Sequence, residues 1–422
     1  MQFIDGGVTA PQGFTANGIL CRIKSSRTTN DTALIYSEKL CNAAGVFTQN
    51  RVKAEAVKYT MKHIADGKMQ AVIANSGNAN CCTGQQGAEV ARRMAELAAG
   101  ELNISPDNVV VCSTGVIGAQ LPVEKIEEKI HELKEGLSKK GHEEARIAIM
   151  TTDTHYKECA VETTIGGKTV RIGAMCKGSG MIHINLGTML AFMTTDCAIS
   201  SQMLEKALRS SIQGTYNCVS VDGDTSTNDT LTILANGMAG NQEITAEGPD
   251  FDAFLEALNE INTVMAKKIA ADGEGATRLI ECNVNGAKDV ETARGLAKAV
   301  ISSSLVKAAM YGADANFGRF LCAMGYSGYD FNPEKVNIWF TSRKGVKRYF
   351  DSNQPFEVHG ENSIKVYENG VPLEFDEDKA KEVLTEEAVE ILVQCGDGQA
   401  CGTAWGCDLT YDYVKINGDY RT

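Results

Sequence analysis

Residues 183–196 read HINLGTMLAFMTTD, and Gly187 and Thr188 stand directly before an apolar run in this stretch. The run TMLAFM combines β-branched, aromatic and aliphatic side chains, so it predicts a buried strand. No histidine, aspartate or cysteine pattern nearby accounts for the Gly-Thr pair. Taken alone, these residues predict that Thr188 is an ordinary strand residue.

Length and composition limit the class of protein. The 422 residues are too many for one ordinary core, which favours two domains or one large composite unit. Hydrophobic residues (43%) and charged residues (23%) occur at the levels of a soluble globular protein. The net charge of −13 argues against a nucleic-acid partner, because phosphate binding needs a basic surface. Without a signal-peptide pattern or an apolar run of roughly 20 residues, the sequence predicts a cytoplasmic protein with no membrane partner.

Cysteine and histidine spacing gives little support for a metal site. The 14 cysteines include no C-x-x-C pair, and the six histidines form no H-x-x-x-H pair. Cys395, Cys401 and Cys407 lie six residues apart in a glycine-rich stretch, which leaves a metal site there as the weaker alternative. The favoured interpretation is reduced, mostly buried thiols that pack as small hydrophobic groups, with no metal.

Hydrophobic periodicity predicts a mixture of helices and strands. Helical patterns cover residues 90–97, 123–133, 202–212, 251–271, 292–310 and 379–393. Strand patterns cover residues 18–23, 70–73, 109–112 and 278–284. Two hairpins are expected, one turning at Gly166-Gly167 and the other at Asn369-Gly370, because both dipeptides favour the type I′ turn. A domain boundary is expected near residues 272–275, where a helical pattern ends in DGEGATRLIE.

Several glycine-rich polar segments are candidates for ligand contact, because glycine lets the backbone approach a ligand closely. They are VCSTGVIG (111–118), MCKGSGMI (175–182), SVDGDTSTNDT (220–230), DGEGATRLIE (272–281) and YGADANFGRF (311–320). None of them is a phosphate-binding P-loop or a dinucleotide fingerprint. The stretch VDGDTSTND has the hard oxygen groups of a magnesium or phosphate site, but a hydrogen-bonded turn is favoured.

Taken together, the motifs are far more informative than any one of them. The segments KGSGMI, GTMLAFMTTD, STGVIG, TTDT, VDGDTSTND, EGATRLIE, GADANFGR and YVKINGDYRT resemble the ornithine acetyltransferase family, the bifunctional glutamate N-acetyltransferases of cyclic arginine biosynthesis. The resemblance runs from GGVTAPQGF to Thr422. It implies a mixed α/β (α+β) fold of layered sheets covered by helices, like that of DmpA-type self-cleaving enzymes, and an α₂β₂ heterotetramer.

The resemblance also implies a special role for the Gly-Thr pair. Family members cut their own chain before the motif threonine, which here separates an α chain of residues 1–187 from a β chain of residues 188–422. Thr188 would become the amino-terminal nucleophile. Its own α-amine, with an ordinary pKa of roughly 7.7–8.0, can take the hydroxyl proton, so no histidine is required.

By the same resemblance, Thr188 carries acetyl from N2-acetylornithine to glutamate as an ester. Thr114 and Gly115 of STGVIG would form the oxyanion hole. The substrate-binding residues implied by the motifs are Thr151, Lys177, Thr188, Glu274, Asn417 and Thr422. Lys177 would meet a substrate carboxylate and Glu274 a substrate amino group. Thr152 and Thr154 remain alternatives to Thr151.

The sequence departs from the family pattern in places, and other functions remain open. The family often has alanine at the positions of Gly187 and Gly418, and PNMA where this chain has INLG. One alternative is an amino-terminal-threonine aminopeptidase or amidohydrolase of related fold, with water as the acceptor. Another is an uncleaved, non-enzymatic binding module. No cofactor is expected, and no motif decides whether acetyl-CoA is a second acetyl donor.

Overall fold

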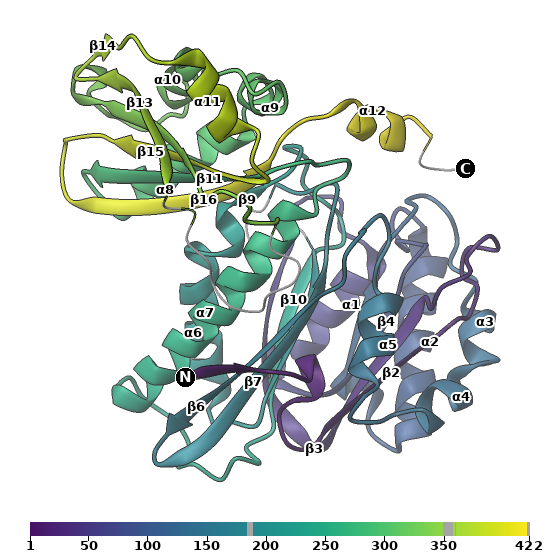
Figure 1. Cartoon of the computed structure of the whole chain (residues 1–422). Coiled ribbons are helices and arrows are strands. Elements are labelled where there is room, and N and C mark those ends of the chain that lie inside the picture. The colour runs from purple at the N-terminus through teal and green to yellow at the C-terminus, as the bar shows by residue number, and fades with distance from the viewer. Residues whose placement is uncertain (184–188, 349–357, 359, 420–422) are drawn as a thin grey trace. The chain divides into compact units, whose positions relative to one another are not determined.

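The computed structural model describes residues 1–183, 189–348, 358 and 360–419. It divides into two compact units. The first comprises Met1–Gly178, Asn185–Gln213 and Thr225–Met265, and the second comprises Ser179–Ile184, Gly214–Asp224 and Ala266–Thr422. Each unit contains its own sheet (Figure 1).

The first unit is built on a nine-stranded mixed sheet in the order β1-β6-β7-β8-β10-β3-β4-β5, with β2 paired to β3. Its strands are β1 (Gln2–Ile4), β2 (Phe14–Ile19), β3 (Thr32–Phe47), β4 (Lys68–Asn75), β5 (Val109–Ser113), β6 (Lys157–Ile165), β7 (Lys168–Lys177), β8 (Leu190–Thr195) and β10 (Thr230–Ala235). Its helices are α1 (Glu55–His63), α2 (Gly84–Leu102), α3 (Val123–Glu127), α4 (Ile130–Glu135), α5 (His142–Ala148), α6 (Ser201–Gln213) and most of α7 (Pro249–Ala271).

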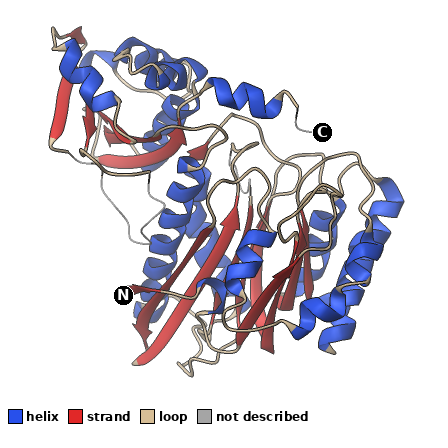
Figure 2. Cartoon of the chain, turned by 45° about the vertical axis from the view of Figure 1, so that its right-hand side comes forward, coloured by secondary structure: helices blue, strands red, loops and turns tan. Residues whose placement is uncertain are grey.

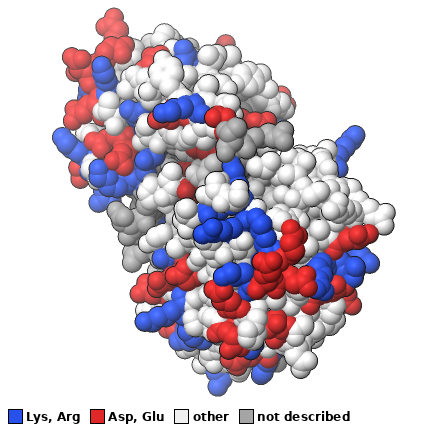
Figure 3. All heavy atoms as spheres, turned by 90° about the vertical axis from the view of Figure 1, so that its right-hand side faces the viewer, with Lys and Arg blue, Asp and Glu red and all other residues white. Residues whose placement is uncertain are grey.

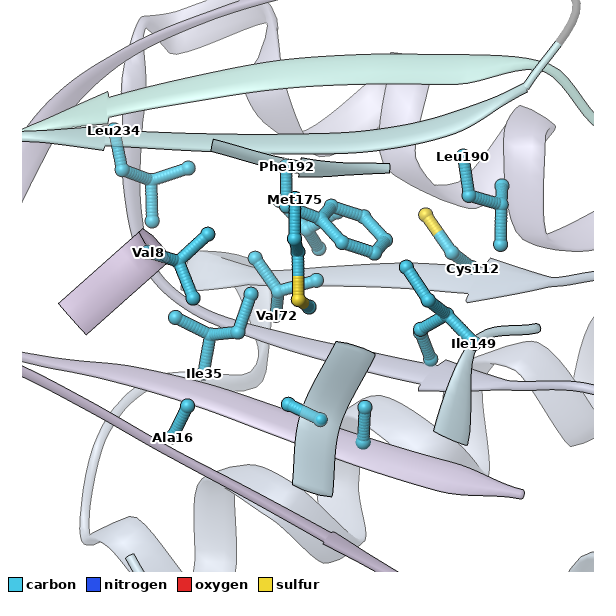
Figure 4. Close-up of a cluster of buried hydrophobic side chains, with 14 of the residues drawn as sticks. Val8, Ala16, Ile35, Val72, Cys112, Ile149, Met175, Leu190, Phe192 and Leu234 are labelled. Atoms are coloured by element: carbon cyan, nitrogen blue, oxygen red, sulfur yellow. The ribbon is translucent and has the colours of Figure 1, made fainter. Parts of the chain in front are cut away.

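Strand β3 joins two parts of this sheet. Residues 32–37 of β3 pair with β2, and residues 42–47 pair with β10. Phe192 and Met175 from one part share a buried cluster with Ile35 and Val72 from the other, so the two parts face each other across a common core (Figure 4). This core places β8, the strand that follows the Gly-Thr pair, in the middle of the unit.

Period-two alternation explains how helices cover the other face of the sheet. Val72 of β4 points into the shared core, whereas its neighbours Ala71 and Ile73 pack with Met94 and other residues of α2. Figure 2 shows the strands of this unit with helices on both sides. The fold is therefore the expected mixed α/β arrangement of layered sheets and helices.

The second unit has a seven-stranded sheet in the order β14-β13-β12-β15-β11-β16-β9. Its strands are β9 (Val219–Ser220), β11 (Leu279–Ala287), β12 (Asn337–Ser342), β13 (Asn362–Glu368), β14 (Val371–Pro372), β15 (Ala388–Gln394) and β16 (Ala400–Cys407). Its helices are α8 (Val290–Ser302), α9 (Ser304–Tyr311), α10 (Phe317–Gly325), α11 (Glu377–Leu384), α12 (Tyr411–Asn417) and the end of α7. Helix α8 packs on β11 and β16.

Both predicted hairpins are confirmed. Strands β6 and β7 pair antiparallel and turn at Gly166 and Gly167, which have φ of 55° and 73°. Strands β13 and β14 turn at Asn369 and Gly370, with φ of 46° and 81°. Positive φ at both central residues is the requirement of the type I′ turn that these dipeptides signal.

Two predicted helices are interrupted. The pattern at 292–310 is two helices, because Ser303 has an extended backbone (φ −70°, ψ 118°) and its side chain caps α9 at the Val306 N–H. The pattern at 123–133 likewise forms the short helices α3 and α4. In both segments the apolar spacing continues through a break in the backbone, so periodicity alone could not locate the break.

Two other predictions need correction. The end of the segment predicted as helix 379–393 instead forms strand β15 (388–394), which lies between β11 and β12 and is buried on both faces. The strand predicted at 18–23 is β2 and ends at Ile19. Beyond it, the N–H groups of Cys21 and Ile23 donate to the carboxylate of buried Asp31 instead of to a neighbouring strand, each at 2.7 Å.

Candidate functional site

Thr114 and Gly115 form a turn directly after β5 in the first unit. Gly115 has φ of 132°, and a Cβ there would lie 2.3 Å from the carbonyl carbon of Gly77, so only glycine fits. The Thr114 N–H donates to the Asn75 carbonyl at 3.0 Å. Among the described residues the Thr114 hydroxyl makes no hydrogen bond, so it remains available to a ligand.

The same turn is held from a second direction by Asn228, which lies in the motif VDGDTSTND. Its side-chain amide donates to the carbonyls of Ser113 and Ala79, at 2.7 and 2.6 Å. Asn228 is buried and directly precedes Asp229 and β10. The sequence predicted a turn here, and the contacts show that this turn also supports the Thr114-Gly115 turn.

Lys177 and Thr151 come together around a carboxylate that the sequence reasoning overlooked. Lys177 is the last residue of β7, and its Nζ lies 3.9 Å from Oδ2 of Asp153. The same Oδ2 accepts from the Thr151 N–H at 3.1 Å, while Oδ1 accepts from the N–H of Gly178 at 2.7 Å. Lys157 also donates to Oδ1, at 2.7 Å.

Asp153 stays ionised in this buried position. Burial by itself would raise the pKa of its carboxyl, but Lys157, Lys177 and the Gly178 N–H outweigh burial and hold the pKa well below its usual range. Asp153 stands inside the quoted motif TTDT, in which only the threonines were considered as candidates. The signal available in the sequence was an aspartate that stands among hydroxyl residues in a turn with few glycines.

A second buried carboxyl, Asp229, lies near Lys177. Asp229 is 2% exposed, and its Oδ2 has no hydrogen-bond partner within the described part of the chain. Burial raises the pKa of Asp229 well above its usual value, although Ser226, Lys177 and Thr48 act in the opposite direction. The next residue, Thr230, donates its N–H to the Met189 carbonyl at 2.9 Å, so Asp229 stands at the start of the β8–β10 pair.

Glu274 and Asn417 are in the second unit and are in direct contact. The Asn417 side-chain amide donates to Oε2 of Glu274 at 2.7 Å. The Glu274 N–H donates to the Ser179 carbonyl at 2.9 Å. A Cβ on Gly180 would lie 2.2 Å from the Glu274 carboxylate. Gly180 of KGSG therefore allows this motif to approach Glu274 of DGEG closely within the second unit.

The remaining candidate residues either have structural roles or lie outside the described residues. Asp222 accepts from the Asp224 N–H, as expected of the favoured turn, and also from the N–H groups of Met181 and Ile182 in KGSGMI. No cluster of metal-ligating side chains occurs in the ranges that the structure describes, and Cys401 is exposed while Cys395 and Cys407 are buried. The prediction of mostly buried thiols is confirmed.

Gly187, Thr188 and Thr422 lie outside the described residues. Of the threonines considered as alternatives, Thr154 is exposed and its hydroxyl lies 2.9 Å from Nδ1 of His155, whereas Thr151 is joined to Asp153 through its N–H. The first unit thus holds Thr114, Gly115, Thr151 and Lys177, and the second holds Glu274 and Asn417.

Surface charge and helix length agree with the composition. Figure 3 shows Lys and Arg side chains intermixed with Asp and Glu over the visible face, without a continuous basic surface. Among the described residues, no helix has both the length and the apolar character that crossing a membrane requires.

Comparison with known proteins identifies the family to which the chain belongs. Residues 15–422 match the ArgJ family. The arginine biosynthesis bifunctional protein ArgJ of Caldanaerobacter subterraneus subsp. tengcongensis is 48% identical over 422 residues, 100% of each chain. That of Thermotoga neapolitana is 49% identical over 414 residues, 98% of this chain and 99% of the relative. A crystal structure of arginine biosynthesis bifunctional protein ArgJ from Bacillus halodurans is 41% identical, with a TM-score of 0.46, and the match covers 54% of this chain and 97% of that one. Because the family match and the matches to the Caldanaerobacter and Thermotoga relatives span nearly the whole sequence, the chain belongs to the ArgJ family of arginine biosynthesis.

Proposed function

We propose that the chain is an acyltransferase that moves acetyl from N2-acetylornithine to glutamate through an ester on Thr188. The family match over residues 15–422 carries this proposal. The geometry supports it, since Lys177 and the Thr114-Gly115 turn belong to the same compact unit as the start of β8. The relatives carry the word bifunctional in their names, which supports acetyl-CoA as a second donor.

The reaction needs a free amino-terminal threonine. In the proposed maturation, the Thr188 hydroxyl attacks the Gly187 carbonyl, the peptide C–N bond breaks as its nitrogen gains a proton, and water opens the resulting ester. The products are an α chain of residues 1–187 and a β chain of residues 188–422, expected to assemble as α₂β₂. A glycine at position 187 helps because it has no Cβ to crowd the attack.

Acetyl transfer then proceeds in two half-reactions. The α-amine of Thr188 takes the hydroxyl proton while the oxygen attacks the acetyl carbonyl of acetylornithine. The Thr114 hydroxyl and Gly115 N–H stabilise the tetrahedral oxyanion, and the ornithine amine leaves with a proton. Glutamate binds next, and its amine attacks the acetyl ester to release N-acetylglutamate and restore Thr188.

The remaining residues hold the substrates. Lys177 is buried and Lys-to-carboxylate bonds are charge-assisted, so it is assigned to the substrate carboxylate. Glu274, which is 6% exposed, is assigned to the substrate amino group, and Asn417 fixes the Glu274 carboxylate. Thr151 and Thr422 complete the binding residues.

An assay of the purified protein tests this function. Acetylornithine with glutamate should yield N-acetylglutamate and ornithine, and acetyl-CoA with glutamate should yield N-acetylglutamate if the chain is bifunctional. An amidohydrolase would release acetate from acetylornithine without glutamate. Equal consumption of acetylornithine with and without glutamate would overturn the transferase.

A further inference from the structure

Asp153 joins two stretches of the first unit, residues 151–157 and 177–178, through one carboxylate. It accepts the N–H groups of Thr151 and Gly178, one on each oxygen, at 3.1 and 2.7 Å. Lys157, which follows four residues later, donates to Oδ1 at 2.7 Å. Lys177, at the end of β7, has its Nζ 3.9 Å from Oδ2. A single side chain therefore sets the separation between the Thr151 main chain and the Lys177 ammonium group.

Lys157 and Asp153 make the fixed part of this cluster. The side chains of both residues are 0% exposed, and the Lys157 ammonium also donates to the His155 carbonyl at 3.1 Å. A buried ion pair persists only when its remaining hydrogen-bonding groups are satisfied. The Asp153 oxygens meet this condition by accepting two backbone N–H groups in addition to Lys157.

Lys177 is the member of this cluster whose ammonium group still has N–H donors to offer to a ligand. Its distance to Asp153 exceeds that of a hydrogen bond, and among the described residues its ammonium group makes none. Asp153 therefore orients Lys177 by charge without using its N–H donors. Two ammonium groups surround one carboxylate here, so the cluster carries an excess positive charge. The other carboxyl near Lys177, Asp229, is buried, and burial raises its pKa well above the usual value.

We propose that Asp153, held by Lys157, is a positioning residue of the acetyltransferase, which aims Lys177 at the carboxylate of the amino-acid substrate. The inference rests on the proposed function for the identity of that substrate. An anion beside Lys177 would complete a cluster of two cations and two anions. Acetylornithine and glutamate each carry an α-carboxylate, so one cluster would receive both in turn.

A double-mutant cycle between Asp153 and Lys177 tests the proposal. Asp153→Asn and Lys177→Met should each raise the KM for acetylornithine and for glutamate roughly tenfold or more, with a much smaller change in kcat, because a charge-assisted bond to substrate is lost. In the Lys177→Met background, Asp153→Asn should have little further effect on KM. Effects that multiply in the double variant would overturn the positioning role.

Asp31 offers a matched control. It is a fully buried aspartate of the same unit that accepts two backbone N–H groups, from Cys21 and Ile23, each at 2.7 Å. Asp31→Asn should lower the melting temperature as Asp153→Asn does and leave both KM values unchanged. A similar KM increase in Asp31→Asn would mean that general destabilisation explains the effect of Asp153→Asn.

A second variant guards against loss of folding. Asp153→Asn together with Lys157→Gln removes the two fully buried charges, so that the Lys157 ammonium group is not left unpaired. It should still show the KM increase, since Lys177 has lost its partner, and a folded protein with normal KM would refute the proposal. Calorimetric binding of glutamate, which does not react with the unacetylated enzyme, gives the same cycle for each variant without turnover. Wild-type binding without acetyl transfer would refute the function alone, and wild-type protein that binds neither substrate would refute both.

Discussion

At the residue scale, the family assignment concentrates the chemistry on a few hydroxyl, amide and charged groups. The structure gives three of them distinct surroundings. The Thr114 hydroxyl makes no hydrogen bond among the described residues, and Lys177 lies beside the buried Asp153. Glu274 is held by a hydrogen bond from Asn417. Such groups are suited to binding a ligand because their positions are set by neighbours while a donor or an acceptor remains available.

The first residue-scale prediction concerns Thr188. Wild-type protein should run as two chains under denaturing conditions, and sequencing of the β chain should begin Thr-Met-Leu-Ala. Thr188→Ala should give one intact chain without acetyl transfer, because alanine has no oxygen to attack Gly187 or carry acetyl. Thr188→Ser should keep part of both activities, since the hydroxyl remains while the methyl that restricts χ1 is gone. Circular dichroism checks folding, and a folded alanine variant that is still cleaved or active would exclude Thr188 as the nucleophile.

The second residue-scale prediction concerns the oxyanion hole. Thr114→Ala should lower kcat by ~10²–10³ without a comparable change in KM, because the lost hydroxyl contacts only the developing charge. Thr114→Ser keeps the hydroxyl and serves as the control, with a much smaller loss. If the alanine variant turned over at the wild-type rate, Thr114 would have only a structural role in the turn after β5.

At the element scale, the points where helices begin and end depend on capping side chains as well as on hydrophobic periodicity. Ser303 separates α8 from α9, and its hydroxyl accepts from the Val306 N–H at 3.4 Å. Asp289 caps the start of α8 in the same way, accepting from Thr292 at 2.7 Å. Each cap satisfies one of the N–H groups that have no partner within the first turn of a helix.

Removing the α9 cap should therefore weaken the second unit. Ser303→Ala should lower the free energy of unfolding by about 1 kcal/mol, as is typical for loss of a serine cap. Ser304→Ala is the matched control, because Ser304 is exposed and is the first residue inside the helix. Urea unfolding of the two variants measures the difference, and equal stability of the two would show that the Ser303 hydroxyl contributes nothing as a cap.

At the scale of the whole molecule, the residues assigned to the reaction are divided between the two units, each of which has its own sheet. The stability of the folded chain also depends on titratable groups that folding removes from water, and the half-buried His183 of the second unit is one of them. Burial and the nearby Lys298 lower the pKa of His183 to about 4, with Asp222 acting in the opposite direction. Its Nδ1 lies 3.0 Å from the Ser220 hydroxyl.

This shift predicts how stability changes with pH. The unfolded chain, in which the His183 pKa is near 6.5, binds a proton more readily than the folded chain between pH 6.5 and about 4. The contribution of His183 is therefore complete above pH 6.5 and is lost as the pH falls toward 4. His183→Gln should make the free energy of unfolding fall less steeply than in wild type between pH 6.5 and 5, measured by denaturant titration. Parallel curves for the two proteins would contradict the depressed pKa.

The sequence determined the features that depend on neighbouring residues. The type I′ turns at Gly166-Gly167 and Asn369-Gly370 need positive φ, which these dipeptides accept, and the apolar run after Thr188 forms β8 as expected. The order of long motifs was sufficient to indicate the family, and with it the roles predicted for the site residues.

The tertiary structure decided what depends on distant partners. Residues 388–394 have an apolar run that suits a helix or a strand, and pairing with β11 and β12 makes it a strand. Asp153 and Asp229 look like turn residues in the sequence, and only folding places both near Lys177. A Cβ on Gly180 would meet the carboxylate of Glu274, a residue far along the chain, and would displace it. Short-range propensity carries no information about such contacts, since burial, charge pairing and close approach are set by segments that meet only in the folded chain.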